Sequence, residues 1–107
     1  MITIDDFFKV EIRVGKVVEA EDVVESNKLI KLRVDFGDEQ RTIFTGVRTY
    51  GYRADDFEGK QWLFVTNLEP KKIMDQESQG MILAVDGEEG KPIFVSGEGM
   101  PTGAKVR

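Results

Sequence analysis

The chain has 107 residues with 20 Asp and Glu against 15 Lys and Arg, a formal net charge of −5, and neither cysteine nor histidine. Its 40% hydrophobic content is typical of a folded protein, and its length suits a single domain over residues 1–107. The missing cysteine and histidine exclude disulfides, thiolate nucleophiles, Cys-based metal sites and the commonest general base. The net acidity argues against a protein that coats nucleic acid by bulk charge alone.

No catalytic or membrane motif is visible. The acidic N-terminal segment is unlike a signal peptide, and the longest apolar runs, at 62–65 and 81–85, are far shorter than the ~20 residues of a membrane span. No serine has a histidine to activate it, no phosphate-binding glycine loop occurs, and adjacent carboxylates such as Asp55 and Asp56 are typical of a solvated turn. We therefore expect a non-catalytic cytoplasmic protein with no cofactor, no bound metal and no membrane partner.

The N-terminal third predicts a short helix followed by a strand. Residues 3–8 begin with a capping hydroxyl and two acids, and a helix there would place Phe7 or Phe8 on the core. Residues 10–17 alternate between apolar and polar side chains, as a half-buried strand does. Gly15 within this strand predicts a bulge or a sharp bend.

The middle of the chain predicts a hairpin and a helical turn. Residues 30–36 alternate cleanly, 37–39 form a turn, and 41–46 are the returning strand. Residues 53–59 predict one helical turn closed by glycine.

The C-terminal part predicts the remaining strands. Residues 61–67 read as a buried strand, Pro70 marks the loop after it, and 79–86 read as a further strand. A glycine-rich tail follows, with a last short strand at 93–95. Five main strands with a small helix between the third and fourth predict an all-β OB-fold, a five-stranded Greek-key barrel with short helices and a C-terminal extension. A β-sandwich is the alternative, but it usually needs more strands.

Charge is unevenly distributed along the chain. Residues 1–25 carry seven acidic and three basic side chains, whereas residues 26–53 carry six basic and three acidic ones. The six basic residues are Lys28, Lys31, Arg33, Arg41, Arg48 and Arg53. They fall on the predicted second and third strands, the face of an OB-fold that usually tracks a nucleic-acid backbone. The alternative is that Lys31 and Arg33 only solvate the outer face of a strand.

A second candidate patch lies within residues 67–81. Lys71 and Lys72, in the loop predicted after the fourth strand, are placed to meet phosphates as point charges. Ser78 is suited to hydrogen bonding with a sugar or a base edge, and Met81 to a soft apolar contact. The pattern alone favours Met81 as a core methionine.

Three aromatic residues are candidates for stacking on bases. Tyr50 and Tyr52 lie in a polar stretch and are the better candidates, whereas Phe44 suits a core position equally well.

Five segments, in the order and at the spacing of the family, resemble the tRNA-binding domain family, and the resemblance runs from about Ile4 to the end of the chain. This domain occurs at the C-terminus of many methionyl-tRNA synthetases, as free-standing tRNA-binding proteins and in eukaryotic aminoacyl-synthetase cofactors. The segments are KVEIRVGKV (9–17), ESNKLIKLRVD (25–35), RTIFTG (41–46), NLEPKK (67–72) and ESQGMILA (77–84).

The resemblance implies an OB-fold that binds tRNA by shape and not by anticodon sequence. It also implies a homodimer in which about residues 84–107 form a dimerisation extension. Asn27, Lys28, Lys31, Arg33, Ser78 and Met81 match its RNA-contact positions, with Lys71 and Lys72 nearby. With Arg41 from the basic hairpin, the candidate RNA-binding residues are Asn27, Lys28, Lys31, Arg33, Arg41, Lys71, Lys72, Ser78 and Met81.

The chain also departs from the family pattern. Thr45 replaces the usual Ser or Ala, and Asp75 stands where glycine is common, placing a carboxylate that would repel phosphate. The family has a chaperone-like branch associated with secretion that generally lacks the segment at 26–29. We therefore expect a homodimeric tRNA-binding domain or subunit that assists a methionyl-tRNA synthetase, or a free-standing one. The alternative is a chaperone-like protein that binds unfolded polypeptides or protein partners.

Overall fold

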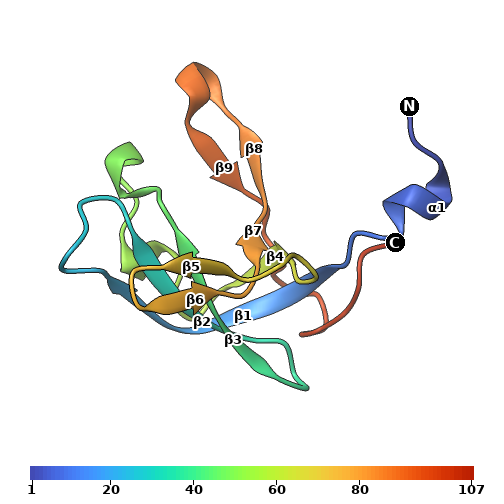
Figure 1. The fold of residues 1–107 in the computed structure, drawn as a ribbon, viewed down its shortest axis with the longest axis horizontal. Helices are drawn as coiled ribbons and strands as arrows, with labels where there is room; N and C mark the ends of the chain where they lie inside the picture. Colours follow the sequence, from blue (N-terminus) through green and yellow to red (C-terminus); the bar gives the residue numbers. More distant parts are fainter.

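The alternating segments form a five-stranded antiparallel sheet that coils into a nearly closed barrel (Figure 1). This computed structural model describes all residues from 1 to 107. The sheet order is β3-β2-β1-β4-β7, which confirms the predicted all-β, OB-type fold. The strands of the barrel are β1 (Ile12–Asp22), β2 (Ile30–Asp35), β3 (Gln40–Thr45), β4 (Gln61–Val65) and β7 (Met81–Ile82).

Two hairpins and four short helical segments complete the fold. The hairpins are β5 (Lys71–Ile73) with β6 (Gln76–Ser78), and β8 (Ala84–Asp86) with β9 (Pro92–Phe94). The helical segments are α1 (Ile4–Phe7) and the 3₁₀ turns η1 (Arg48–Tyr50), η2 (Ala54–Asp56) and η3 (Glu88–Gly90). No helix has the length and hydropathy that crossing a membrane requires.

The core follows the predicted alternation along β2. Ile30, Leu32 and Val34 are completely buried, while the intervening Lys31 and Arg33 stay partly exposed on the outer face. Three phenylalanines fill the barrel with them: Phe36, Phe57 and Phe64. Each large apolar side chain buried in this way contributes about 1.5–3 kcal/mol of transfer free energy, so the barrel interior is the main source of stability.

Gly15 allows core side chains to pack closely against the backbone of β1. The prediction of a bulge at this residue is wrong. The bulge lies at Val18, because β1 pairs Val17 with Val34 and then Glu19 with Arg33. Gly15 itself sits in regular register with β4. A Cβ atom at Gly15 would lie 2.5 Å from Val34 Cγ1, so the three core side chains around it leave no room for a methyl group.

The C-terminal tail pairs with strand β1 of the same chain. The amide of Val14 donates to Ala104 O at 2.9 Å, and the amide of Gly103 donates back to Val14 O at 2.7 Å. Arg13, which is buried, fastens the same end because its Nε donates to Gly103 O at 3.0 Å and its Nη2 to Phe36 O at 3.2 Å. The tail therefore acts as an additional strand along the first half of β1.

Helix α1 forms as predicted but does not plug the core. Thr3 caps it through a capping box with Asp6, which confirms the predicted start. The helix buries no residue, however, and lies apart from the barrel (Figure 1), with Phe8 53% exposed. The prediction that Phe7 or Phe8 fills the core is wrong, because the phenylalanines of the barrel strands and of the segment after η2 already occupy it.

The predicted strand at 79–86 is broken into separate short strands. β6 ends at Ser78, β7 covers only two residues, and β8 leaves the barrel to form the projecting hairpin (Figure 1). Gly80 marks the first break, with φ at +153° and no space for a Cβ beside Val65 O. The prediction that Lys71 and Lys72 lie in a loop is also wrong, since both lie on strand β5.

Candidate nucleic-acid interface

The β5–β6 hairpin is fastened to the free edge of β3. Ser78 Oγ accepts the amide of Phe44 at 3.0 Å, and Gln79 Oε1 accepts the amide of Thr42 at 3.0 Å. The amide of Gln79 donates in turn to Thr42 O at 2.8 Å. These bonds satisfy the edge amides of β3, which an open strand would leave unpaired, and they fix the hairpin in place on the barrel.

Arg41 contributes to this attachment and is not free for a ligand. Its Nε and Nη2 form a two-fold contact with Glu39, at 2.8 and 3.1 Å, and its Nη1 donates to Thr66 O and to Gln79 O. The hydrogen bond with Glu39 raises the pKa of Arg41 and lowers the pKa of Glu39. The guanidinium thus holds together the β2–β3 turn, the end of β4 and the segment after β6.

A groove of about 780 Å³ lies between this hairpin and the barrel. Its lining includes three lysines, Lys28, Lys71 and Lys72, against a single carboxylate, that of Glu69. None of the three lysines has a carboxylate within 4.0 Å, whereas most of the arginines are engaged within the protein. The apolar part of the lining consists of Leu29, Phe44, Leu68, Ile73 and Met81. Unpaired ammonium groups around an apolar surface suit a polyanion that also presents apolar faces.

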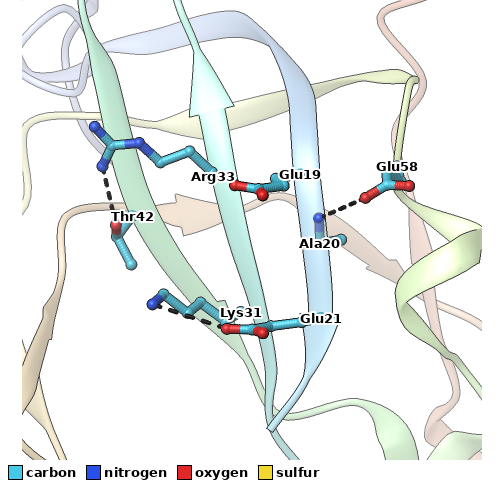
Figure 2. Close-up of a pocket in the computed structure, with 7 residues that line it drawn as sticks. All are labelled: Glu19, Ala20, Glu21, Lys31, Arg33, Thr42 and Glu58. Atoms are coloured by element: carbon cyan, nitrogen blue, oxygen red, sulfur yellow. Dashed lines mark hydrogen bonds and ion pairs between the residues drawn. The ribbon is translucent and has the colours of Figure 1, made fainter.

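Lys31 and Arg33 lie on a different surface, the outer face of β2 (Figure 2). The hollow there, of about 450 Å³, is lined by these two cations together with Glu19, Glu21 and Glu58. Lys31 Nζ lies 3.9 Å from Glu21 Oε1, and the guanidinium of Arg33 donates to Thr42 Oγ1 at 3.0 Å and Gln40 Oε1 at 3.3 Å. The face predicted to be basic therefore carries mixed charge.

The structure places the predicted RNA-binding residues at four locations. Five lie together in the groove: Lys28, Lys71, Lys72, Ser78 and Met81. Lys31 and Arg33 share the mixed-charge face, and Arg41 is engaged in the hairpin attachment. Asn27 is exposed on the loop directly before Lys28.

Within the groove, two side chains are placed differently from the sequence pattern. Met81 is 47% exposed, so the core position that its pattern favoured is wrong. Ser78 is only 6% exposed and its hydroxyl is already bonded to Phe44 N. Leu68, which is 48% exposed and lines the groove, was missed by sequence reasoning, because the sequence does not show which single apolar residues of a loop are exposed.

The aromatic candidates for stacking are also separated. Tyr52 packs edge-to-face on Phe94 at 5.1 Å and donates its hydroxyl to Pro92 O at 2.6 Å, so it holds the β8–β9 hairpin. Phe44 is buried beneath the β5–β6 hairpin, and Tyr50 alone is exposed. No group of three or more acidic side chains is arranged to hold a metal ion.

The chain belongs to the family described as putative tRNA binding domain, which matches residues 12–105. Among curated proteins it is 48% identical over 106 residues to the methionine–tRNA ligase of Thermotoga maritima, and 44% identical over 108 residues to methionine–tRNA ligase 1 of Bacillus cereus. These matches cover 98% and 99% of this chain but only 16% of each ligase. The chain therefore spans about one sixth of the length of these relatives.

Solved structures with the same fold cover the whole chain. A MetRS-related protein from Pyrococcus horikoshii superposes with a TM-score of 0.93 at 42% identity, covering 100% of this chain and 98% of that one. The CsaA chaperone protein from Picrophilus torridus superposes with a TM-score of 0.86 at 30% identity, covering 100% of both chains. The chain is thus a tRNA-binding-domain protein related to a part of methionyl-tRNA synthetases, with chaperone structures among its structural neighbours.

Proposed function

We propose that this protein is a non-catalytic tRNA-binding module that holds the RNA backbone in the groove between the β5–β6 hairpin and the barrel. The observation that carries the proposal is the set of three unpaired lysines, Lys28, Lys71 and Lys72, around one groove in a protein of net charge −5. Against that acidic background, the groove is a locally positive surface that directs a polyanion to one side of the molecule.

Each groove residue has a distinct part in this proposal. The lysines neutralise phosphates as point charges, and Asn27 hydrogen-bonds the sugar or backbone beside Lys28. Met81 offers an apolar contact to an exposed ribose or base. Because the Ser78 hydroxyl is buried and bonded to Phe44 N, its part is to position the hairpin that carries Lys71 and Lys72.

The relationship to methionyl-tRNA synthetases supports tRNA and such a synthetase as the partners. We propose that the module raises the affinity of such a synthetase for tRNA, as a domain or as a subunit, and works in the cytoplasm where tRNA is charged. The similarity of the chain to about one sixth of two such ligases supports this assignment.

The test is the salt dependence of tRNA binding. Replacing Lys71 and Lys72 together with alanine should remove two phosphate contacts and lower the slope of log K against log salt by about 1.5 units. A matched control replaces Lys16 and Lys60, which are exposed and do not line the groove, and so changes the net charge equally. Equal slopes for the two double variants would refute the assignment of the groove.

We propose in addition that the protein is a homodimer through the β8–β9 hairpin, part of the extension at about residues 84–107. Val85 and Ile93 are cross-strand partners there, exposed by 59% and 54%, on a hairpin that projects from the barrel (Figure 1). Light scattering of the wild-type protein should report twice the chain mass of 12.1 kDa. The V85D/I93D variant should have the mass of one chain. The V24D variant, altered at another exposed valine, should remain dimeric; a wild-type particle of 12.1 kDa would contradict the proposal.

A second candidate function is chaperone-like binding of unfolded polypeptide. It is favoured by the similarity to CsaA chaperone structures and by the apolar lining of the groove, which suits an extended peptide. Competition decides between the two. If unfolded polypeptide binds and bulk tRNA does not displace it, the chaperone function holds; if only tRNA binds, the first proposal holds.

A further inference from the structure

The antiparallel register of β1 and β2 sets acidic residues directly beside the cations of the outer face. Glu19 is paired with Arg33 and Glu21 with Lys31, so each cation has a carboxylate-bearing residue as its cross-strand neighbour. Glu58 adds a third carboxylate to the same hollow, and its Oε1 accepts the amide of Ala20 at 3.0 Å (Figure 2). Side chains of opposite charge at such cross-strand positions are close enough to form an ion pair where their rotamers allow it.

The two cations are engaged in different ways. Lys31 Nζ lies 3.9 Å from Glu21 Oε1, whereas Arg33 points away from Glu19 and donates to Thr42 and Gln40 on β3 (Figure 2). A phosphate that approaches Lys31 therefore meets the carboxylate of Glu21 at the same point. The groove lysines differ, because none of them has a carboxylate within 4.0 Å, although Lys72 also has a glutamate, Glu77, as its cross-strand neighbour.

We propose that Glu21 is a specificity-determining residue that screens Lys31 from polyanions. With this screen, the outer face of β2 adds to binding only when the groove lysines already hold the RNA in a fixed position. A folded RNA whose rigid backbone spans both surfaces meets this condition, and a flexible single strand that reaches only one surface does not. The inference rests on the proposed function, because it assumes that the groove binds RNA.

The strength of the screen follows from the distance. Two unit charges 3.9 Å apart in water interact by about 1 kcal/mol, which corresponds to about a fivefold change in a binding constant. Removing the charge of Glu21 should also free Lys31 to displace one condensed counterion, adding ~0.7 units to the salt slope for a single strand.

The experiment compares Glu21→Gln with the wild-type protein, using poly(U) and bulk tRNA as probes at several salt concentrations. Glu88→Gln is the control, since it makes the same change of net charge at an exposed residue of η3 that lies outside the hollow. We expect Glu21→Gln to bind poly(U) about fivefold more tightly, to gain less for tRNA, and so to lose discrimination between the two. Glu88→Gln should leave discrimination unchanged.

A double-mutant cycle identifies the residue that is screened. Lys31→Ala should have little effect in the wild-type background and should abolish the gain in the Glu21→Gln background. The inference is overturned if Glu21→Gln and Glu88→Gln behave alike, or if Lys31→Ala weakens poly(U) binding equally in both backgrounds. The proposed function fails by a different measurement: if the wild-type protein binds no tRNA, or if the Lys71 and Lys72 double variant binds tRNA unchanged. The inference then fails as well, because it rests on that function.

Discussion

Ser78→Ala tests the attachment of the β5–β6 hairpin to the barrel. The serine hydroxyl accepts the amide of Phe44 at 3.0 Å in a buried position and also lies 3.3 Å from Gly80 O. Alanine fits the same space without strain, so the change removes the acceptor of the Phe44 amide and the weaker donation from the hydroxyl to Gly80 O. The buried amide of Phe44 is then left without a partner, because the hairpin covers it from solvent.

The expected cost is that of one buried unsatisfied amide, about 1–3 kcal/mol in the free energy of unfolding. For a chain of this size, that corresponds to a fall in Tm of roughly 4–13 °C. We also expect weaker tRNA binding at temperatures well below Tm, because the loosened hairpin carries Lys71 and Lys72.

Urea denaturation with circular dichroism measures the first effect, and a fluorescence titration with tRNA at 10 °C measures the second. Ser96→Ala is the matched control, since its hydroxyl accepts the amide of Glu98 at 3.1 Å in an exposed turn where water replaces the lost bond. Stability within 0.5 kcal/mol of wild type for Ser78→Ala would refute the reasoning that this bond fixes the hairpin.

Three further predictions concern the barrel and its ends. Gly15→Ala should destabilise the fold by about 1–3 kcal/mol in urea titrations, because the new methyl group would lie 2.5 Å from Val34 Cγ1; a neutral result would mean that the core can move apart freely. The hydrogen bond from Arg41 holds the pKa of Glu39 below its ordinary 4.5, so this carboxylate stabilises the folded state above about pH 4.5 and loses that effect as pH falls through the lowered pKa. Glu39→Gln should therefore reduce the fall of the unfolding free energy at acid pH. If the pH dependence is unchanged in this variant, other carboxylates cause the loss of stability in acid. Tyr52→Phe removes the hydroxyl that donates to Pro92 O at 2.6 Å; it should speed amide hydrogen exchange in the β8–β9 hairpin and leave exchange in β2 unchanged.

The fold was predictable because its main strands have simple local patterns. Every inward position of β2 is apolar, and the turn after it contains Gly37, which has φ at +91°. The break at residues 80–83 was not predictable in the same way. The apolar run from Met81 to Val85 suits one buried strand as well as two short ones, and only the different partners of the two strands distinguish them, since β7 pairs with β4 and β8 with β9.

The candidate site was only partly predictable, since its form depends on contacts between distant segments. The two-residue turn at Met74 and Asp75 lacks the Asn-Gly or Asp-Gly pattern of a tight hairpin, and Met74 adopts a φ of 56°, so the sequence predicted a loop. The charge of each segment was read correctly from the sequence. The pairing that puts Glu21 beside Lys31 is a matter of register between strands, which no count of charges along the chain reveals.

The pairing of residues 103–106 with the start of β1 joins two segments that lie about 90 residues apart in the chain. The ribosome produces β1 first, yet Ile12 and Val14 receive their last backbone partners from Val106, Gly103 and Ala104. At a synthesis rate of about 5–20 residues per second, the beginning of β1 waits several seconds with one edge open. This edge of β1 is therefore completed only after residues 103–106 have been synthesised.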